Sequence, residues 1–404
     1  MRHKTEERAF TRKRCFTFKT ISLFIISSIQ SSLQRELDRF FKRFNESDIT
    51  ERFVTKSAFS QARKKIDPEA FRELNQKTVN HFYSHYKYHK WKNHRLIAID
   101  GSEVLLPSNK ETINEYGDYA NNRTKKNVVL ARFSKAYDVL NNIAIDAYLT
   151  KRTNGEQMLA EKHLEYLGKG DLLLLDRGYP SYYLFKRILQ NESDFCARVT
   201  VSNWLIAKEF AASGQTDAII ELEPSRTIVK NLYKNGIDTI PLKLRFIKIK
   251  LDSGEDEVLI TSLLDSNYQY DWFKSLYHMR WGVEESFKVD KHQLRMEDFS
   301  GYTVQSIMQE FNAIILLSNL AMVFSHVDER ETQKKKLKYK VSVTLAISKF
   351  RENLVALFKN IRNLDIMEKL MKVIWNNTIP IRDGRTSERN VYRRRRYHYQ
   401  YKNL

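Results

Sequence analysis

Three acidic residues stand where a folded chain can bring carboxylates together. Asp100 closes the apolar run that begins at Arg95, Asp176 follows the run Leu172–Leu175, and Glu284 lies in a segment with helical spacing. Carboxylate oxygens are the ligands that Mg²⁺ and Mn²⁺ prefer. Two such ions about 3.5–4 Å apart can activate a water and stabilise the leaving oxygen of a phosphodiester. Taken singly, each acid is also explained as a turn residue or a solvated helix charge.

The residues around Glu284 strengthen this reading of the segment. At about 100° per residue, a helix places four of them within an arc of roughly 60°: Tyr277, Arg280, Glu284 and Lys291. Trp281 lies at the edge of that arc. Cations beside a carboxylate suit phosphate oxygens, and an exposed aromatic ring can stack on an unpaired base. A salt-bridged amphipathic helix is the alternative that this pattern leaves open.

The segments that carry these acids and lie around them predict a mixed α/β fold. Val128–Val139 and Ile143–Leu149 have strand texture and are joined at Asn141-Asn142, a pair suited to a tight turn. Leu172–Leu175 is a continuous apolar run, as expected of a buried parallel strand. Ala218–Val229 is expected to be a further strand. Strand pairs followed by alternating helices and strands predict a mixed sheet.

Changes in texture divide the chain into five expected regions. We expect a helical N-terminal DNA-binding region, the first part of a catalytic core, a β-rich insertion, the rest of the core with the Glu-bearing helix, and a helical C-terminal region with a basic tail: 1–90, 91–200, 201–265, 266–330 and 331–404. The tail carries four consecutive arginines between tyrosines, which predicts contact with nucleic-acid phosphates: Arg393, Arg394, Arg395 and Arg396.

Composition narrows the function classes. The chain has 404 residues, with 69 Lys and Arg against 49 Asp and Glu, so its net charge is 69 − 49 = +20. Such an excess predicts a polyanionic partner, nucleic acid first and an anionic membrane surface second. Two cysteines cannot build a disulfide scaffold. No apolar run reaches the ~20 residues of a membrane span, and no glycine-rich phosphate loop appears, so we expect neither a membrane nor a nucleotide cofactor.

The spacing Tyr277-x2-Arg280-x3-Glu284-x6-Lys291 resembles the signature of a branch of bacterial insertion-sequence transposases of the DDE class, transposase family four. Asp100 in Ile-Ala-Ile-Asp-Gly-Ser and Asp176 in Leu-Leu-Asp-Arg-Gly-Tyr resemble the first and second aspartate boxes of that branch. Phe195-Cys-Ala-Arg198 resembles the strand that follows. The resemblance covers roughly residues 50–325.

This resemblance implies an RNase H-like catalytic core with a β-rich insertion between the second Asp and the Glu. It implies that Asp100, Asp176 and Glu284 coordinate two divalent ions, Mg²⁺ with Mn²⁺ as a substitute. Further residues would contact DNA, with Trp281 stacking on a flipped base: Tyr277, Arg280, Trp281, Lys288 and Lys291.

The resemblance also implies an activity. Members cut double-stranded DNA at terminal inverted repeats and use the 3′-hydroxyl to attack target DNA, so we expect a homodimer on DNA in the bacterial cytoplasm, associated with the nucleoid. Two alternatives stay open. One is a catalytically silent DNA-binding descendant of such an enzyme, and the other is an RNase H-like nuclease that cuts without strand transfer.

Overall fold

The computed structural model describes residues 2–12, 14–120, 127–251, 254–326, 339–359 and 364–380. Its chain forms two compact units. The sheet unit comprises Tyr88–Glu103 and Arg132–Phe287, and the helical unit comprises Met1–Lys87, Val104–Ala131 and Lys288–Leu404. The arginines 393–396 lie outside the described residues. The five regions expected from the sequence stay predictions.

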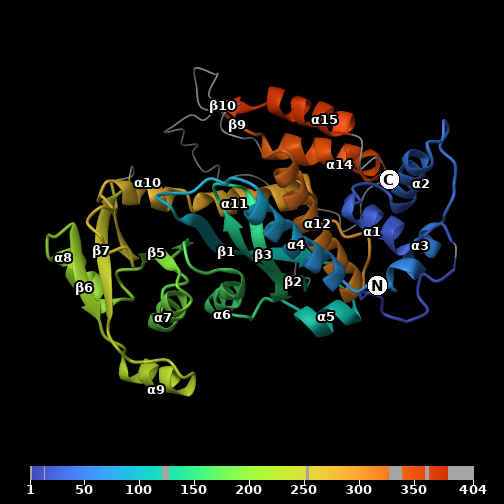
Figure 1. Cartoon of the computed structure of the whole chain (residues 1–404). Coiled ribbons are helices and arrows are strands. Elements are labelled where there is room, and N and C mark those ends of the chain that lie inside the picture. Colours follow the sequence, from blue (N-terminus) through green and yellow to red (C-terminus); the bar gives the residue numbers. More distant parts are fainter. Residues whose placement is uncertain are drawn as a thin grey trace. The chain divides into compact units, whose positions relative to one another are not determined.

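An eight-stranded sheet organises the fold, in the order β3-β2-β1-β4-β5-β8-β7-β6 (Figure 1). β1 runs parallel to β4, and β4 parallel to β5. The sheet is mixed, as the sequence predicted, because β8 pairs antiparallel with β5. The strands are β1 (Arg95–Leu106), β2 (Val129–Asp138), β3 (Ile143–Lys151), β4 (Asp171–Leu175), β5 (Asp194–Val199), β6 (Asp217–Leu222), β7 (Leu242–Lys250) and β8 (Asp256–Thr261).

The register of β1 against β4 determines where the two aspartates lie. Ile99 pairs with Leu175 at the end of the ladder, so Asp100 and Asp176 each follow one member of that pair. Leu172–Leu175 is fully buried, which explains its unbroken apolar run, since a parallel strand is covered on both faces. One expectation was wrong: Asp100 does not end its strand, because β1 continues to Leu106.

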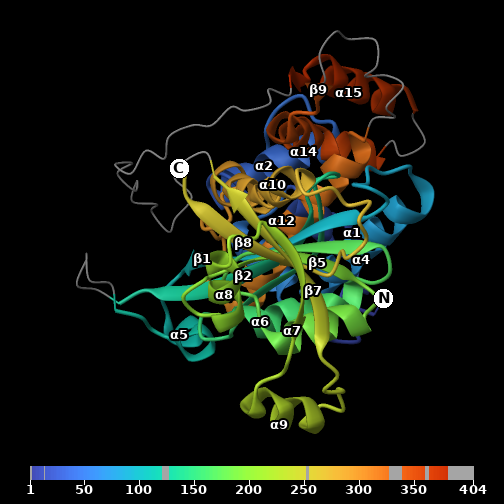
Figure 2. The ribbon, with the colours of Figure 1, turned by 90° about the vertical axis from the view of Figure 1, so that its left-hand side faces the viewer.

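The β-rich insertion extends the sheet. β8 pairs antiparallel with β5, β7 with β8, and β6 with β7. Two helices accompany these strands, α8 (Leu205–Ala212) and α9 (Arg226–Lys234). Figure 2 shows α9 in the connection between β6 and β7. The strand expected over Ala218–Val229 is therefore too long: β6 ends at Leu222, and Ser225 caps α9 by accepting from the Ile228 N–H.

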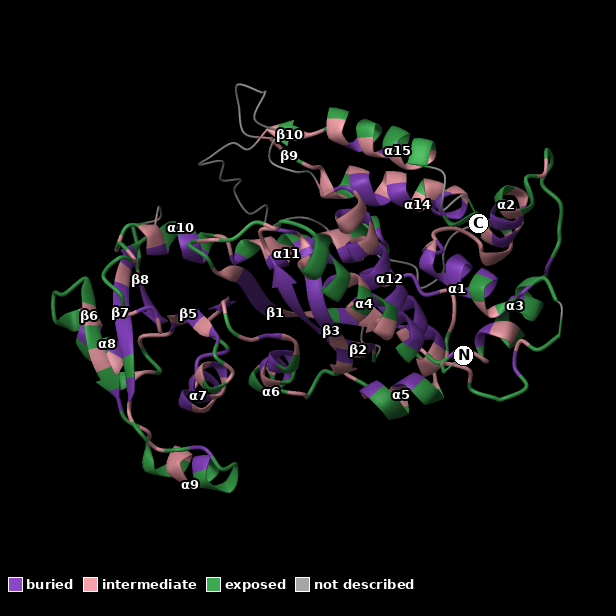
Figure 3. Ribbon diagram, viewed as in Figure 1, coloured by how far each residue is buried: buried purple, intermediate pink, exposed green. Residues whose placement is uncertain are grey.

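The remaining helices of the sheet unit contact its strands. α7 packs on β5, α6 on β3, and α8 and α10 on β7. The strands of the central sheet are buried, whereas α9 is largely exposed (Figure 3). The bounds are α6 (Glu156–His163) with a 3₁₀ turn at Leu164–Tyr166, α7 (Tyr182–Gln190), α10 (Trp272–His278), α11 (Trp281–Lys288) and a π-helical turn at Val289–Gln293.

In the helical unit, α12 contacts α4, α14 and α1. α12 is long and apolar enough to cross a membrane by length and composition, but 72% of that window is buried inside the structure, as in a core helix. The elements are α1 (Phe18–Ile26), α2 (Leu33–Asn45), α3 (Lys56–Arg63), α4 (Glu69–His85), α5 (Lys110–Tyr116), α12 (Val304–Phe324), β9 (Tyr339–Lys340), α14 (Val343–Lys359), α15 (Leu364–Asn376) and β10 (Ile379–Pro380).

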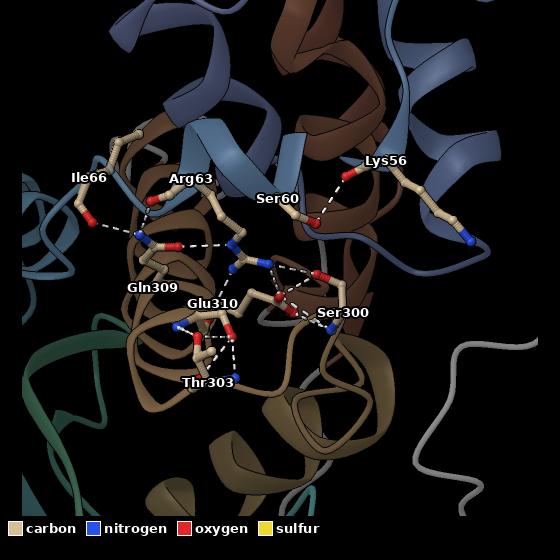
Figure 4. A network of polar contacts seen from close by, with 9 residues as sticks. Lys56, Ser60, Arg63, Ile66, Ser300, Thr303, Gln309 and Glu310 are labelled. Atoms are coloured by element: carbon tan, nitrogen blue, oxygen red, sulfur yellow. Dashed lines mark hydrogen bonds and ion pairs between the residues drawn. The ribbon is translucent and has the colours of Figure 1, made fainter. Parts of the chain in front are cut away.

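A buried arginine connects α3 to α12 in the helical unit (Figure 4). Arg63 donates to Gln309 Oε1 at 3.0 Å, to Glu310 Oε1 at 3.1 Å and to Ser300 Oγ at 3.1 Å. It also donates to the backbone oxygen of Ser306 at 3.0 Å. Burial lowers the pKa of Arg63, while Glu310 acts in the opposite direction. This cluster is named the Arg63 network.

Candidate active site

Asp100 lies at the carboxyl end of the β1–β4 ladder, and its carboxylate accepts from the Gly101 N–H at 2.8 Å. The pKa of Asp100 is raised to about 6, chiefly by burial and further by the like charges of Glu284 and Asp176. The Gly101 N–H and Arg280 act against that rise. A carboxyl group in this setting gains from a nearby cation.

Asp176 follows β4 and is surrounded by donors. Arg198 Nε donates to Asp176 Oδ1 at 3.0 Å, and the Tyr277 hydroxyl donates to the same oxygen at 3.1 Å. Burial alone would raise the pKa of Asp176, but Arg280, the Arg177 N–H and Arg198 together lower it. The two aspartates therefore have pKa values that move in opposite directions, which is typical of functional carboxylate pairs.

Arg280 joins the third acid to this pair. Its Nη2 donates to Glu284 Oε1 at 2.8 Å, and its Nη1 lies 3.6 Å from Asp100 Oδ2. The side chain is 4% exposed, and its Nε and Nη1 atoms are buried without a hydrogen-bond acceptor among the described residues. Buried donors without acceptors are costly. Oxygen acceptors of a ligand would satisfy these donors.

The helix that carries Glu284 is not continuous, contrary to the arc argument from the sequence. α10 ends at His278 and α11 begins at Trp281, and the bonds from Arg280 N to Tyr277 O and from Val283 N to Arg280 O span three residues. Tyr277 is buried, and its hydroxyl faces Asp176. Trp281, by contrast, is 49% exposed.

Two contacts hold α11 against β2 and the turn that follows it. Lys135 Nζ donates to Ser286 Oγ at 3.0 Å, and both residues are buried. A Cβ added at Gly282 would lie 3.1 Å from the side chain of Val139. The helix therefore approaches so closely that any side chain at position 282 would press on its neighbour. These contacts fix the position of Glu284 relative to Arg280.

The carboxylates suit divalent ions by type, because hard oxygen donors are what Mg²⁺ and Mn²⁺ require. Within the described ranges, however, no group of three or more His, Cys, Asp or Glu side chains is gathered closely enough to hold a metal ion. The Arg280 guanidinium lies among the acids and bonds to Glu284. The carboxylates thus match divalent ions in donor type, and Arg280 is bonded to one of them.

The other residues predicted for DNA contact lie elsewhere in the chain. Lys288 and Lys291 belong to the helical unit, in which Lys288 ends α11 and Lys291 lies in the π-helical turn. The 100° spacing that grouped Lys291 with Glu284 does not apply across that turn. The roles of both lysines stay predictions.

Asp146 of β3 takes part in a buried network. His163 Nδ1 lies 2.9 Å from Asp146 Oδ2, and His163 Nε2 lies 3.0 Å from Ser134 Oγ. All three side chains are enclosed by protein. The order Ser–His–Asp resembles a hydrolase triad, but substrate has no access to it, so it joins β2, β3 and α6 as a structural element.

Three further groups were not singled out as site residues from the sequence. Arg198 contacts Asp176, and Glu156 lies beside the glycines that follow both aspartates. A groove in the helical unit is lined by cations of α2 and α14: Arg39, Lys42, Arg43 and Lys359. The only sequence signal for these was the Phe195–Arg198 segment, which resembled a family strand.

Comparison with known proteins identifies the family. The family described as "Transposase DDE domain" matches residues 91–320, more than half of the 404-residue chain. The transposase InsG for insertion sequence element IS4 of Escherichia coli (strain K12) is 24% identical over 282 residues, which cover 66% of this chain and 60% of InsG. The chain therefore spans less than two thirds of that relative.

A solved structure of the piggyBac transposase synaptic complex with hairpin DNA is 14% identical, with a TM-score of 0.45, covering 94% of this chain and 81% of that chain. The family match spans Asp100, Asp176 and Glu284 and the strands and helices that carry them. The chain belongs to the transposases with a DDE domain.

Proposed function

We propose that this transposase binds the terminal inverted repeats of its element, cleaves phosphodiester bonds with two divalent ions, and joins the 3′-hydroxyl end to target DNA. One observation carries the proposal. Asp100 and Glu284 both contact the buried guanidinium of Arg280, and Asp176 interacts with that guanidinium electrostatically. Those three acids are the set that the family resemblance implies for metal binding.

In this proposal Asp100, Asp176 and Glu284 would hold two Mg²⁺ ions, with Mn²⁺ as a substitute. When bound, such ions supply Lewis-acid stabilisation and lower the pKa of a bound water. The protein's own contribution is to keep the carboxylates ionised and adjacent. The donors around Asp176 lower its pKa, whereas Asp100, with a pKa of about 6, gains most from a cation.

Arg280 and Tyr277 would hold the DNA phosphate. Arg280 has two buried donor atoms that find no acceptor in the described part of the chain, and phosphate oxygens are acceptors that suit its planar fork. The Tyr277 hydroxyl bonds to Asp176 and thereby orients that carboxylate. A phosphate that took over the Arg280 donors would release Glu284 from its ion pair and leave that carboxylate available to a cation.

Other residues would extend the DNA contact. The exposed Trp281 ring is available to stack on a flipped base, and Lys288 and Lys291 carry charges suited to the backbone. The four arginines at 393–396 would add nonspecific phosphate contacts. In the helical unit, three cations that line the groove between α2 and α14 offer a phosphate path: Arg39, Lys42 and Arg43.

The assembly implied by this activity is a homodimer on double-stranded DNA, because two element ends must be joined in one reaction. The proposed partners are the terminal inverted repeats and target DNA. The proposed location is the bacterial cytoplasm, in association with the nucleoid. Strand transfer draws on the phosphodiester itself, so the proposal includes no nucleotide cofactor and no membrane.

The test is a cleavage and strand-transfer assay on labelled DNA that carries the element's inverted repeat, with Mg²⁺, Mn²⁺ or EDTA. Asp176→Asn and Glu284→Gln should abolish nicking and joining while DNA binding persists. Asp271→Asn serves as the matched control, since Asp271 is an exposed acid at the start of α10. Salt-sensitive binding without cleavage in either metal would instead support the catalytically silent descendant, and cutting without joining would support a nuclease.

A further inference from the structure

A fourth carboxylate lies beside the two aspartates in the sheet unit. Glu156 begins α6, and Arg132 of β2 donates through Nη1 to Glu156 Oε1 at 2.6 Å. A negative charge in the first turn of a helix is favoured by the helix dipole. The bond from Arg132 orients the carboxylate. It faces Gly101, which follows Asp100 within β1, and Gly178, in the turn after Asp176.

Glycines lie next to this carboxylate at both positions, Gly101 within β1 and Gly178 in the turn after β4. A Cβ added at Gly178 would lie 2.6 Å from Glu156 Oε2, a distance that real Cβ atoms do not show. A Cβ added at Gly101 would lie 3.7 Å from Glu156 Oε1, an ordinary contact. Neither glycine has a positive φ, so the backbone conformation does not demand glycine at these positions. A side chain at Gly178 would therefore have to displace the Glu156 carboxylate from its present position.

A buried hydroxyl group also lies next to Gly101. Tyr179 is 1% exposed, and its hydroxyl lies 3.8 Å from the position of a Cβ at Gly101. That hydroxyl has no hydrogen-bond partner among the described residues. Asp100, Glu156 and Asp176 all act on it electrostatically. A buried donor without an acceptor among three carboxylates indicates that a ligand completes this group of side chains.

We propose that Glu156 is a positioning residue for metal binding by Asp100 and Asp176. Its carboxylate packs against Gly101 and Gly178 and so supports the backbone that follows each aspartate, whose spacing the β1–β4 register provides. The inference rests on the proposed two-metal function, because only that function requires the two carboxylates to keep one mutual orientation. Glu156 acts through the backbone at Gly101 and Gly178, without itself touching the DNA.

The test measures Mn²⁺ binding to the full-length protein by electron paramagnetic resonance of free Mn²⁺, without DNA. Glu156→Ala should raise the Kd by roughly 10–100-fold, the usual effect of losing a residue that orients metal ligands. Glu161→Gln is the matched control: Glu161 lies on the same helix and accepts from Arg187 at 3.0 Å, away from Gly101 and Gly178. Both variants should keep the wild-type melting temperature within a few degrees.

A second variant tests the same contact from the glycine side. Gly178→Ala should displace the Glu156 carboxylate and weaken Mn²⁺ binding without altering any acid. Both changes disturb the same contact, that of Gly178 with Glu156. The double variant Gly178→Ala/Glu156→Ala should therefore bind Mn²⁺ no more weakly than the weaker-binding single variant.

The outcomes separate the two proposals. Mn²⁺ binding by Glu156→Ala and Gly178→Ala within twofold of wild type would overturn the role of Glu156. The role of Glu156 would also be overturned if the increases in Kd of the two single variants multiplied in the double variant. The proposed two-metal function itself would fail if wild type bound no Mn²⁺, or if Asp176→Asn bound Mn²⁺ as tightly as wild type. If Glu156→Ala lost its fold, the Gly178→Ala result alone would decide.

Discussion

Replacing Arg63 by methionine should destabilise the helical unit substantially. The Arg63 and Glu310 side chains are each 6% exposed, so the change leaves a carboxylate buried without its cation. Breaking a buried pair from one side costs about 3–5 kcal/mol. Glu310 keeps the Ser300 N–H at 3.0 Å and the Ser300 hydroxyl as donors, which places the expected loss near the lower end, about 3 kcal/mol.

Urea unfolding followed by circular dichroism measures this loss. For a unit of this size, about 3 kcal/mol corresponds to a fall in melting temperature of roughly 6–12 °C. Arg52→Met is the matched control, because Arg52 is 64% exposed and lies 3.6 Å from Asp38, so the loss there should stay under about 1 kcal/mol. Adding Glu310→Leu to Arg63→Met should recover part of the stability, since it removes the orphaned charge.

The reasoning would be refuted if Arg63→Met and Arg52→Met lowered the free energy of unfolding by the same amount. It would also be refuted if the Arg63→Met/Glu310→Leu double variant were less stable than Arg63→Met alone. The first result would mean that the network contributes nothing beyond a surface pair. The second would mean that the loss comes from packing and not from the buried carboxylate.

Three further predictions follow from single contacts. Gly282→Ala should press on the neighbouring turn, cost about 1–3 kcal/mol and lower strand cleavage, as measured by urea unfolding and the cleavage assay. Arg39→Ala/Arg43→Ala should weaken DNA binding for all sequences and reduce the slope of log K against log salt by about 2, as measured by anisotropy titrations; an unchanged slope would exclude the groove as a phosphate path. Burial raises the pKa of the Cys196 thiol to about 12, so at pH 8 a thiol reagent should modify the exposed Cys15 at once and Cys196 only after unfolding.

The sheet and its aspartates could be predicted because their signals are local. An apolar run without polar interruption needs cover on both faces, which identified β4. Asp100 and Asp176 lie side by side because each follows one member of the last residue pair of the β1–β4 ladder, although β1 itself continues. Asn142 adopts φ 57° in the β2–β3 connection, which agrees with the turn expected at Asn141-Asn142. The family match covers the rest of the core, but it does not specify which side chains contact one another.

The contacts within the site could not be predicted from spacing. The arc around Glu284 assumed an unbroken helix, whereas the chain breaks between α10 and α11. Nothing in the helical period reveals that break, because contacts such as that of Gly282 with Val139 involve a distant segment. The partnership of Arg198 with Asp176 likewise depends on the register of β5 beside β4.

The interleaved order of the sheet has a consequence for synthesis of the protein. Asp100 and Asp176 are separated by 176 − 100 = 76 positions, and Glu284 follows after a further 284 − 176 = 108, because β6, β7 and β8 come between. At translation rates of about 5–20 residues per second, those last 108 positions take roughly 5–20 s. A nascent chain therefore exposes a basic, helical N-terminal segment well before its third acid exists. On the proposed function, nucleic acid bound by that segment during the interval would not be cut.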